Sequence, residues 1–273
     1  MNPSTLIGLF TGLSILGSVF YWSADDPAMF LNLPGFGIVM GGTLAATFIA
    51  FPLNEVTRVF GLFWTVLKNE KMYVQNDIEE LVSVSKTWMS GDLRKAEAHL
   101  EIIGNPFLKS GLQMVIEMTP HDDIMEFMSW RITRLQAKEQ AEAQLFRVMS
   151  AFAPAFGMIG TLVGLINMMF ILGSGDMVAI GHQLAVALMT TFYGVLLANL
   201  IFKPVAVKLE RRTEERVMLM NMIMQGISLM SRKKSPIMMR ETLNSFVASY
   251  SDEIWDGKNK PVISRNDGNK VRS

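Results

Sequence analysis

Residues 153–165 read Ala-Pro-Ala-Phe-Gly-Met-Ile-Gly-Thr-Leu-Val-Gly-Leu, and they lie inside an uncharged apolar run at 151–172. A helix needs about 20 mostly apolar residues to cross a hydrocarbon core roughly 30 Å thick. Runs of similar length without Asp, Glu, Lys or Arg occur at 5–22, 34–53 and 177–202. The sequence therefore predicts an all-α membrane protein with four transmembrane helices.

The composition restricts the function classes. The chain is 50% hydrophobic and 18% charged, and its 25 basic residues equal its 25 acidic ones, so no basic excess points to nucleic acid. The absence of cysteine excludes disulfides and thiolate metal sites, and three histidines do not suggest a closed zinc site. No Gly-rich phosphate loop or His-Glu-x-x-His motif occurs. We therefore expect neither an enzyme, a catalytic residue, a bound metal nor a cofactor.

The charge distribution predicts the orientation of the spans. All the basic residues fall within 54–150 or 203–273, and the two short connectors carry only acids, at Asp25, Asp26 and Asp176. Because basic loops stay in the cytoplasm, the connectors are expected outside, and both termini and the long insert inside. The N-terminal run lacks a basic segment before it, so we expect a retained helix and not a cleaved signal peptide.

This layout divides the chain into five expected segments. The insert between the second and third spans forms a cytoplasmic helical domain, and a helical cytoplasmic tail follows the fourth span. The expected boundaries are a first transmembrane hairpin at 1–53, the helical domain at 54–150, a second hairpin at 151–202, the helical tail at 203–250, and a disordered C-terminus at 251–273.

Capping signals predict helices within the insert. Asn76 and Glu79 have the spacing of a capping box before a helix at 78–89, and Asp92 can cap a segment that ends near 104–106. After Pro120, apolar residues at helical spacing predict a helix over 121–149 that continues into the third span.

Several residues in the spans allow two interpretations. Pro154 and Pro204 are either tolerated membrane prolines or hinges. Thr161, Thr190 and Thr191 either bond the carbonyl one turn back or line a water-filled path for a cation. The spans also contain small-residue pairs that allow close helix packing, at Gly8 and Gly12, Gly37 and Gly41, and Gly160 and Gly164. No span carries an acid, so a conducted ion would need a carboxylate from another subunit.

The run from Ala153 resembles the third membrane segment of the MotA and PomA family of flagellar motor stator proteins. Residues 179–204, from Ala-Ile-Gly-His-Gln-Leu-Ala-Val-Ala-Leu-Met-Thr-Thr-Phe-Tyr-Gly through Phe-Lys-Pro, resemble its fourth segment. The resemblance covers residues 1 to about 250. It implies a multi-pass protein of the bacterial inner membrane, with five copies around two copies of a single-span, peptidoglycan-binding MotB or PomB partner. That partner's aspartate would carry the ion, and the insert would push the rotor protein FliG.

The resemblance also implies residue roles. Pro154 and Pro204 match two motif prolines that couple ion binding to conformational change. Thr161 and Thr191, with Thr190 adjacent, match hydroxyls that face the partner's aspartate in the sodium-driven branch, which favours Na⁺ over H⁺ as the transported cation. In the insert Glu97 matches an acid that contacts the rotor, whereas Met89 stands at the expected arginine. The basic rotor contacts would then be Lys86, Arg94 and Lys95.

The sequence is compatible with three other functions. A proton-driven stator would share the same layout. An ExbB or TolQ type energiser of outer-membrane processes usually has three spans with its large insert after the first, which disagrees with the four runs here. A membrane scaffold that moves no ion would need none of the implied residues.

Overall fold

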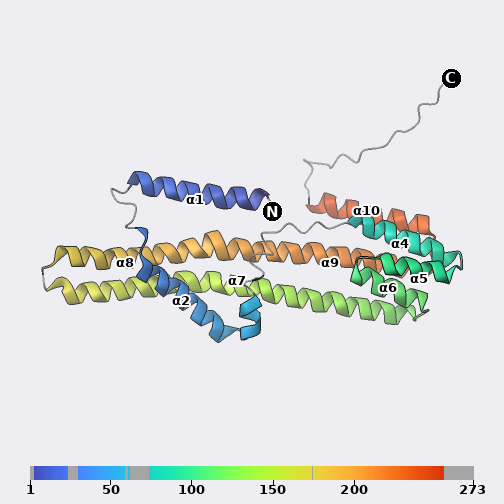
Figure 1. Ribbon diagram of the computed structural model, residues 1–273, viewed down its shortest axis with the longest axis horizontal. Helices are drawn as coiled ribbons and strands as arrows, with labels where there is room; N and C mark the ends of the chain where they lie inside the picture. Colours follow the sequence, from blue (N-terminus) through green and yellow to red (C-terminus); the bar gives the residue numbers. More distant parts are fainter. Residues whose placement is uncertain (1–2, 24–29, 59–60, 62–73, 174, 255–273) are drawn as a thin grey trace, which may run out of the picture. The chain divides into compact units, whose positions relative to one another are not determined.

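Helices make up the secondary structure of the computed structural model, which describes residues 3–23, 30–58, 61, 74–173 and 175–254 (Figure 1). No strand occurs within these residues. The chain divides into two compact units, Met1–Met72 with Ile132–Val217, and Tyr73–Arg131 with Met218–Ser273. The five segments expected from the sequence were defined by which residues lie in the membrane, whereas these two units are defined by packing. The expected segment boundaries therefore stay predictions. Of the C-terminus expected to be disordered, 251–273, residues 251–254 form the end of α10 (Pro236–Ile254), because this helix continues further than the sequence suggested. The rest, from 255 onward, lies outside the described residues.

The apolar runs form the helices of the first unit. Within the described chain, three stretches are long and apolar enough to cross a membrane: α2 (Leu33–Ala50), α7 (His121–Leu172) and the continuous helical run Met177–Ser231. The remaining expected span, 5–22, lies in α1 (Pro3–Ser23), which contains no charged residue. The span count of four and the orientation therefore stay predictions, while the all-helical fold is confirmed.

Helix α2 starts and packs through small polar groups. The Asn32 side chain accepts a hydrogen bond from the Gly35 amide at 2.8 Å, which caps the first turn. Thr43 and Thr47 are fully buried, and each hydroxyl donates to the carbonyl one turn earlier, at 2.6 and 2.7 Å. These internal bonds let α2 bury both hydroxyls with their hydrogen bonds satisfied.

Helix α7 is a single helix of 52 residues, so the predicted continuity of the insert with the third span is confirmed. At 1.5 Å per residue it is roughly 80 Å long. It begins after Pro120 with Asp122 and Asp123 in its first turn, where carboxylates favour the positive end of the helix dipole. Pro154 lies inside it. The helix contributes residues to both units.

The fourth predicted span contains an irregularity that the sequence analysis did not anticipate. Helix α8 (Met177–Leu196) passes into a π-helix, η2 (Leu197–Phe202), and then into α9 (Lys203–Ser231). The predicted helical tail after residue 203 is confirmed in α9. Asp176 caps α8, because its carboxylate accepts from the amides of Val178 and Ala179 at 3.1 Å.

The core of the first unit lies where α2, α7 and the α8–η2–α9 run meet. Its buried members are Val39, Val56, Ala143, Leu145, Phe146, Met149, Ala153, Leu197, Ala198, Phe202, Ala206 and Leu209. The start of α2 is held near the end of α8, since the Asn32 amide donates to the Tyr193 hydroxyl at 2.8 Å and that hydroxyl donates to the Phe30 carbonyl. Three residues of the π-helix, Leu197, Ala198 and Phe202, are therefore buried in this core, whereas Asn199 is exposed.

The second unit contains α4 (Val74–Met89), α5 (Leu93–Ile102), α6 (Pro106–Ile116), the start of α7, the end of α9 and α10 (Pro236–Ile254). Its largest fully buried side chains come from all these elements except α5: Ile78, Leu81, Leu108, Leu112, Ile124, Met128, Met222, Ile223, Ile227, Met230 and Met239. Helix α10 packs along α4 (Figure 1).

The capping predictions for the insert had mixed outcomes. The Asp92 cap is confirmed, because its carboxylate accepts from the Lys95 amide at 3.2 Å. The Asn76 capping box is wrong: α4 begins at Val74, so Asn76 lies within the first turn. The segment that Asp92 caps, α5, ends at Ile102, close to the expected 104–106. Asn105 caps the next helix, α6. Its side chain accepts from the Phe107 amide at 3.0 Å and donates to Asp77 at 3.0 Å, which ties α6 to α4.

Candidate ion pathway and coupling site

Helices α7 and α8 approach each other backbone to backbone (Figure 1). A Cβ on Gly157 would lie 2.9 Å from the Thr190 carbonyl oxygen, and one on Gly194 would lie 2.6 Å from the Ala153 carbonyl oxygen. A Cβ on Gly164 would lie 2.7 Å from that of Ala187. The interface therefore requires glycine at these positions, as in other close membrane helix pairs.

The other predicted glycine pairs behave differently. A Cβ on Gly160 would also collide with Thr190, at 2.6 Å, so the packing role of the Gly160 and Gly164 pair is confirmed. Around Gly8, Gly37 and Gly41 no atom of the described chain lies within 4 Å of a built Cβ, and Gly12 meets only Leu200, at 3.6 Å. Of the three predicted pairs, the one formed by Gly160 and Gly164 is thus the pair that packs closely within the described chain.

Two of the predicted threonines meet across this interface. The Thr161 and Thr191 hydroxyl oxygens are 2.5 Å apart. The Thr161 hydroxyl oxygen also lies 3.0 Å from the Gly157 carbonyl oxygen and 3.2 Å from the Ala187 carbonyl oxygen. The Thr191 hydroxyl oxygen lies 3.4 Å from the Gly157 carbonyl oxygen. Four oxygens, two hydroxyl and two carbonyl, therefore converge at one place. Oxygen atoms of these kinds replace the hydration shell of alkali cations in selective pathways.

Thr190, the third predicted pathway residue, is placed differently from its neighbour. It is fully buried, and its hydroxyl donates to the Ala187 carbonyl at 2.7 Å in its own helix. Its methyl group would lie 3.1 Å from a Cβ on Gly35, and its side chain also fills the space beside Gly160. The structure therefore brings Thr161 and Thr191 together and places Thr190 as a packing contact between α7 and α2.

The two helical stretches that bear the oxygen cluster supply neither a carboxylate nor a basic side chain. Neither 151–172 nor 177–202 contains Asp, Glu, Lys or Arg, and His182 is exposed near the start of α8. A cation that leaves water for such a site needs a compensating charge, because neutral dipoles alone repay little of its desolvation. This geometry therefore fits a path that is completed by a carboxylate from outside the chain.

Pro154 lies at the same interface, two helical turns before Thr161. It has no backbone N–H, so one hydrogen bond of α7 is missing there. A Cβ on Gly194 would lie 3.1 Å from the Pro154 Cα, so α8 presses directly on the proline. A movement of α8 at Gly194 would consequently displace the turn of α7 that lacks this hydrogen bond.

Pro204 lies two residues after the π-helix, in the first turn of α9. The Lys203 amide donates to the Ala198 carbonyl, five residues earlier, and Pro204 itself cannot donate. In a regular α-helix the proline ring would clash with the carbonyl four residues earlier. The π-turn is wider, so it separates the ring from the preceding carbonyls. The two predicted coupling residues are therefore both in turns where the regular hydrogen-bond pattern is broken.

The predicted rotor contacts all lie on the hairpin of α4 and α5. Lys86, Arg94 and Glu97 are exposed, while the Lys95 ammonium forms an exposed ion pair with Asp92 at 2.8 Å. Their hydrogen bond lowers the pKa of Asp92 and raises that of Lys95. Met89, at the position where the resemblance led us to expect arginine, is 42% exposed. The structure therefore gathers these charges on one hairpin.

Ion pairs that the sequence analysis missed tie α7 to its neighbours in the first unit. Arg147 donates to Glu210 of α9 through two nitrogens, one of them at 2.7 Å, and Arg216 pairs with Glu139. Arg58 lies 2.7 Å from Glu142. Burial raises the pKa of Glu142, and Arg58 opposes this shift. Only tertiary contacts reveal these pairs, because the partners are far apart in sequence.

The chain is similar to several curated proteins along most of its length. It is 31% identical over 250 residues to motility protein A of Aquifex aeolicus, covering 88% of this chain and 94% of the relative. It is 32% identical over 260 residues to the uncharacterised protein YtxD of Bacillus subtilis, with 95% and 90% coverage. It is 28% identical over 258 residues to chemotaxis protein PomA of Vibrio alginolyticus, with 93% and 96% coverage.

Solved structures share the fold. The MotAB structure of C. jejuni matches with a TM-score of 0.82 at 21% identity, over 90% of this chain and 96% of that one. The flagellar MotAB stator complex of Bacillus subtilis matches with a TM-score of 0.81 at 23% identity, over 91% and 97%. A family model described as the MotA/TolQ/ExbB proton channel family matches residues 99–222. The chain belongs to this MotA/TolQ/ExbB family, whose members are channel-type subunits and not enzymes.

Proposed function

We propose that this chain, a MotA-type subunit of the flagellar motor stator, forms a cation path along α7 and α8 and converts inward cation flow into rotor torque. The observation that carries the proposal is the convergence of the Thr161 and Thr191 hydroxyls with two backbone carbonyls on an otherwise uncharged helix pair. Family membership and the names of its relatives support the same role.

The charge that this path lacks would come from a partner. We expect a single-span, peptidoglycan-binding subunit of the MotB or PomB type, whose membrane carboxylate faces Thr161 and Thr191. The solved relatives are complexes of MotA with MotB, which supports such a partner. We further expect five copies of this chain around two of the partner, in the bacterial inner membrane with both termini in the cytoplasm.

We expect Na⁺ to be the transported ion. A proton needs only a titratable group, whereas Na⁺ must replace several waters with oxygen ligands, and the threonine cluster offers four oxygens. The presence of PomA among the relatives is compatible with either ion, since most of the related names are motility protein A. Proton transport is the alternative.

The turns at Pro154 and Pro204 would transmit the conformational change from the membrane helices to the α4–α5 hairpin. Pro154 packs against Gly194 of α8, and Pro204 joins the π-helix to α9, so both lie between the oxygen cluster and the second unit along the chain. The charged α4–α5 hairpin, with Lys86, Arg94, Lys95 and Glu97, would then push the rotor protein FliG.

An ExbB or TolQ type energiser is the second candidate, because the same family model describes both groups. The presence of both α1 and α2 before the insert favours the stator role. Deleting the gene separates the two: a stator mutant keeps its flagella but does not swim or swarm, and the intact gene restores movement. Normal motility in a strain without any other stator would contradict the proposal.

A further inference from the structure

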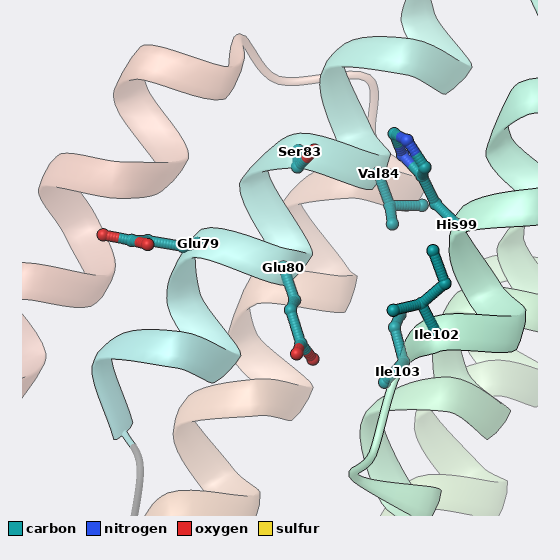
Figure 2. A pocket seen from close by; sticks show the side chains of 7 residues that line it. All are labelled: Glu79, Glu80, Ser83, Val84, His99, Ile102 and Ile103. Carbon is teal, nitrogen blue, oxygen red and sulfur yellow. The ribbon is translucent and has the colours of Figure 1, made fainter.

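A cavity of about 270 Å³ lies in the second unit, between α4 and α5 (Figure 2). Its lining consists of Glu79, Glu80, Ser83, Val84, His99, Ile102 and Ile103. Figure 2 shows the Glu80 carboxylate beside Ile103 and the His99 ring near Val84, while Glu79 extends away from α5. The walls are thus mainly apolar, with a carboxylate and an imidazole in different parts of the cavity.

Two polar atoms of this cavity are buried without a hydrogen-bond partner among the described residues, Glu80 Oε2 and His99 Nδ1. Burial raises the pKa of the Glu80 carboxyl, and the nearby charge of Asp77 raises it further. Asp77 differs from Glu80 because Asn105 donates to it at 3.0 Å. Unsatisfied buried polar atoms are rare in folded proteins, so these two indicate a missing partner.

The lining defines the chemistry of that partner. A carboxylate oxygen accepts hydrogen bonds and favours a positive charge, while Val84, Ile102 and Ile103 favour hydrocarbon. A lysine or arginine side chain combines an apolar stem with a cationic head. No group of three metal-ligating side chains occurs in the part of the chain that the structure describes. A basic side chain therefore fits the cavity better than a metal ion.

The C-terminal segment 255–273 carries such side chains. It contains Lys258, Lys260, Arg265, Lys270 and Arg272 against two acids, whereas residues 74–103 carry six acids and three bases. It follows α10, which packs on α4, the helix that bears Glu80. Fully extended, the segment reaches roughly 60 Å, so its length does not limit access. A tethered ligand of this kind has an effective concentration on the order of millimolar.

We propose that the α4–α5 cavity is a docking site for a basic side chain of the chain's own segment 255–273, held by the Glu80 carboxylate. The docked segment would lie on the hairpin that carries Glu97 and Arg94. If the proposed rotor contact is right, docking would compete with the rotor and hold the subunit in an inactive state. This consequence rests on the proposed function, whereas the docking itself does not.

Disulfide trapping tests the docking without any motility readout. The chain has no cysteine, so Ser83→Cys in the cavity can be paired with Ser264→Cys in the segment, in the full-length subunit purified with its partner. We expect an intramolecular disulfide, identified by mass spectrometry of the linked peptides. Its yield should fall by about fivefold in a Glu80→Gln background and should fall at high salt.

Two controls make the result decisive. In the first control, Ser83→Cys is replaced by Ser90→Cys, an exposed position just after α4, and is again paired with Ser264→Cys. The disulfide yield of this pair measures random collisions. Glu101→Gln removes an exposed acid of α5 and should leave the yield unchanged. A yield equal to the Ser90 background, or one that Glu80→Gln does not lower, would overturn the proposal. Disulfides mainly between two chains would also overturn it, since the occupant would then be another copy.

Discussion

The hydroxyl oxygens of Thr161 and Thr191 lie 2.5 Å apart across the α7–α8 interface, and both are within 3.4 Å of the Gly157 carbonyl oxygen. The contact depends on glycine at 157, because any larger side chain there would separate the two helices. Packing and chemistry are thus linked at one position: the same close approach that stabilises the helix pair brings four oxygens together.

Removing either hydroxyl should weaken cation binding. Thr161→Val and Thr191→Val keep the side-chain shape but delete one oxygen ligand, so we expect the external Na⁺ concentration for half-maximal swimming speed to rise about tenfold. Thr161→Ser should retain most of the speed. Thr43→Val is the matched control, because that hydroxyl bonds only the Val39 carbonyl of α2. Equal Na⁺ dependence in wild type and both valine variants would contradict the pathway assignment.

Adding a methyl group at Gly194 should destabilise the helix pair. The new Cβ would stand 2.6 Å from the Ala153 carbonyl oxygen, a backbone atom that cannot move aside cheaply, so we expect a loss of about 1–3 kcal/mol. The free energy of unfolding of the detergent-solubilised complex measures this loss. Gly181→Ala is the control on the same helix, where the described chain leaves open space, and it should not destabilise. Similar stabilities for the two variants would show that the interface is looser than described.

Restoring the missing backbone donor at Pro204 should uncouple the motor. In Pro204→Ala the new N–H can bond the carbonyl four residues earlier, which favours a regular α-helix over the π-turn at 197–202. We expect the complex to assemble at normal levels, measured by co-purification with the partner, while swimming is lost. Pro236→Ala, at the start of α10, should leave swimming intact. Wild-type swimming by Pro204→Ala would refute a coupling role.

Neutralising Asp77 should stabilise the chain at neutral pH. Burial raises the pKa of this carboxyl above its ordinary 3.8, so the folded state holds the proton more tightly than the unfolded state. Stability of the wild type therefore rises as pH falls through the folded pKa, and levels off below the unfolded value. Asp77→Asn keeps an acceptor for Asn105 and should raise the midpoint of thermal unfolding by a few degrees at pH 7.5.

That gain should shrink as the pH falls through the raised pKa of Asp77, because the wild-type carboxyl then takes up its proton in the folded state. Asp122→Asn, an exposed acid in the first turn of α7, serves as the control and should bring no gain, since its charge favours the helix dipole. A gain for Asp77→Asn that is the same at every pH would contradict burial of the charged form as its cause.

Features set by local sequence were predicted well. Uncharged runs predict α2, α8 and the 151–172 part of α7, and Asp92 identifies the start of α5, because length, hydropathy and capping act over a few neighbouring residues. The Asn105-Pro106 pair carries a similar signal for the start of α6, an N-cap followed by proline, which the sequence analysis did not use. The start of α4 was misplaced because a capping box alone does not exclude an earlier turn.

Features set by tertiary packing could not be predicted. The π-helix at 197–202 depends on how Pro204 and the buried core around Phe202 are accommodated together, and neither condition is local. The pairing of Arg147 with Glu210 and of Arg58 with Glu142 joins distant segments of similar composition. Thr190 and Thr191 are adjacent in sequence, yet only the packing of α2 and α7 around α8 distinguishes the buried residue from the one that meets Thr161.

The most direct test of the central claim is swimming speed measured against external Na⁺ at fixed pH, in cells whose only stator contains this chain. We predict that speed rises with Na⁺ and saturates, that it persists when the proton gradient alone is collapsed, and that Thr161→Val shifts the curve to higher Na⁺. Speed that is independent of Na⁺ but falls with the proton gradient would contradict a sodium path through Thr161 and Thr191.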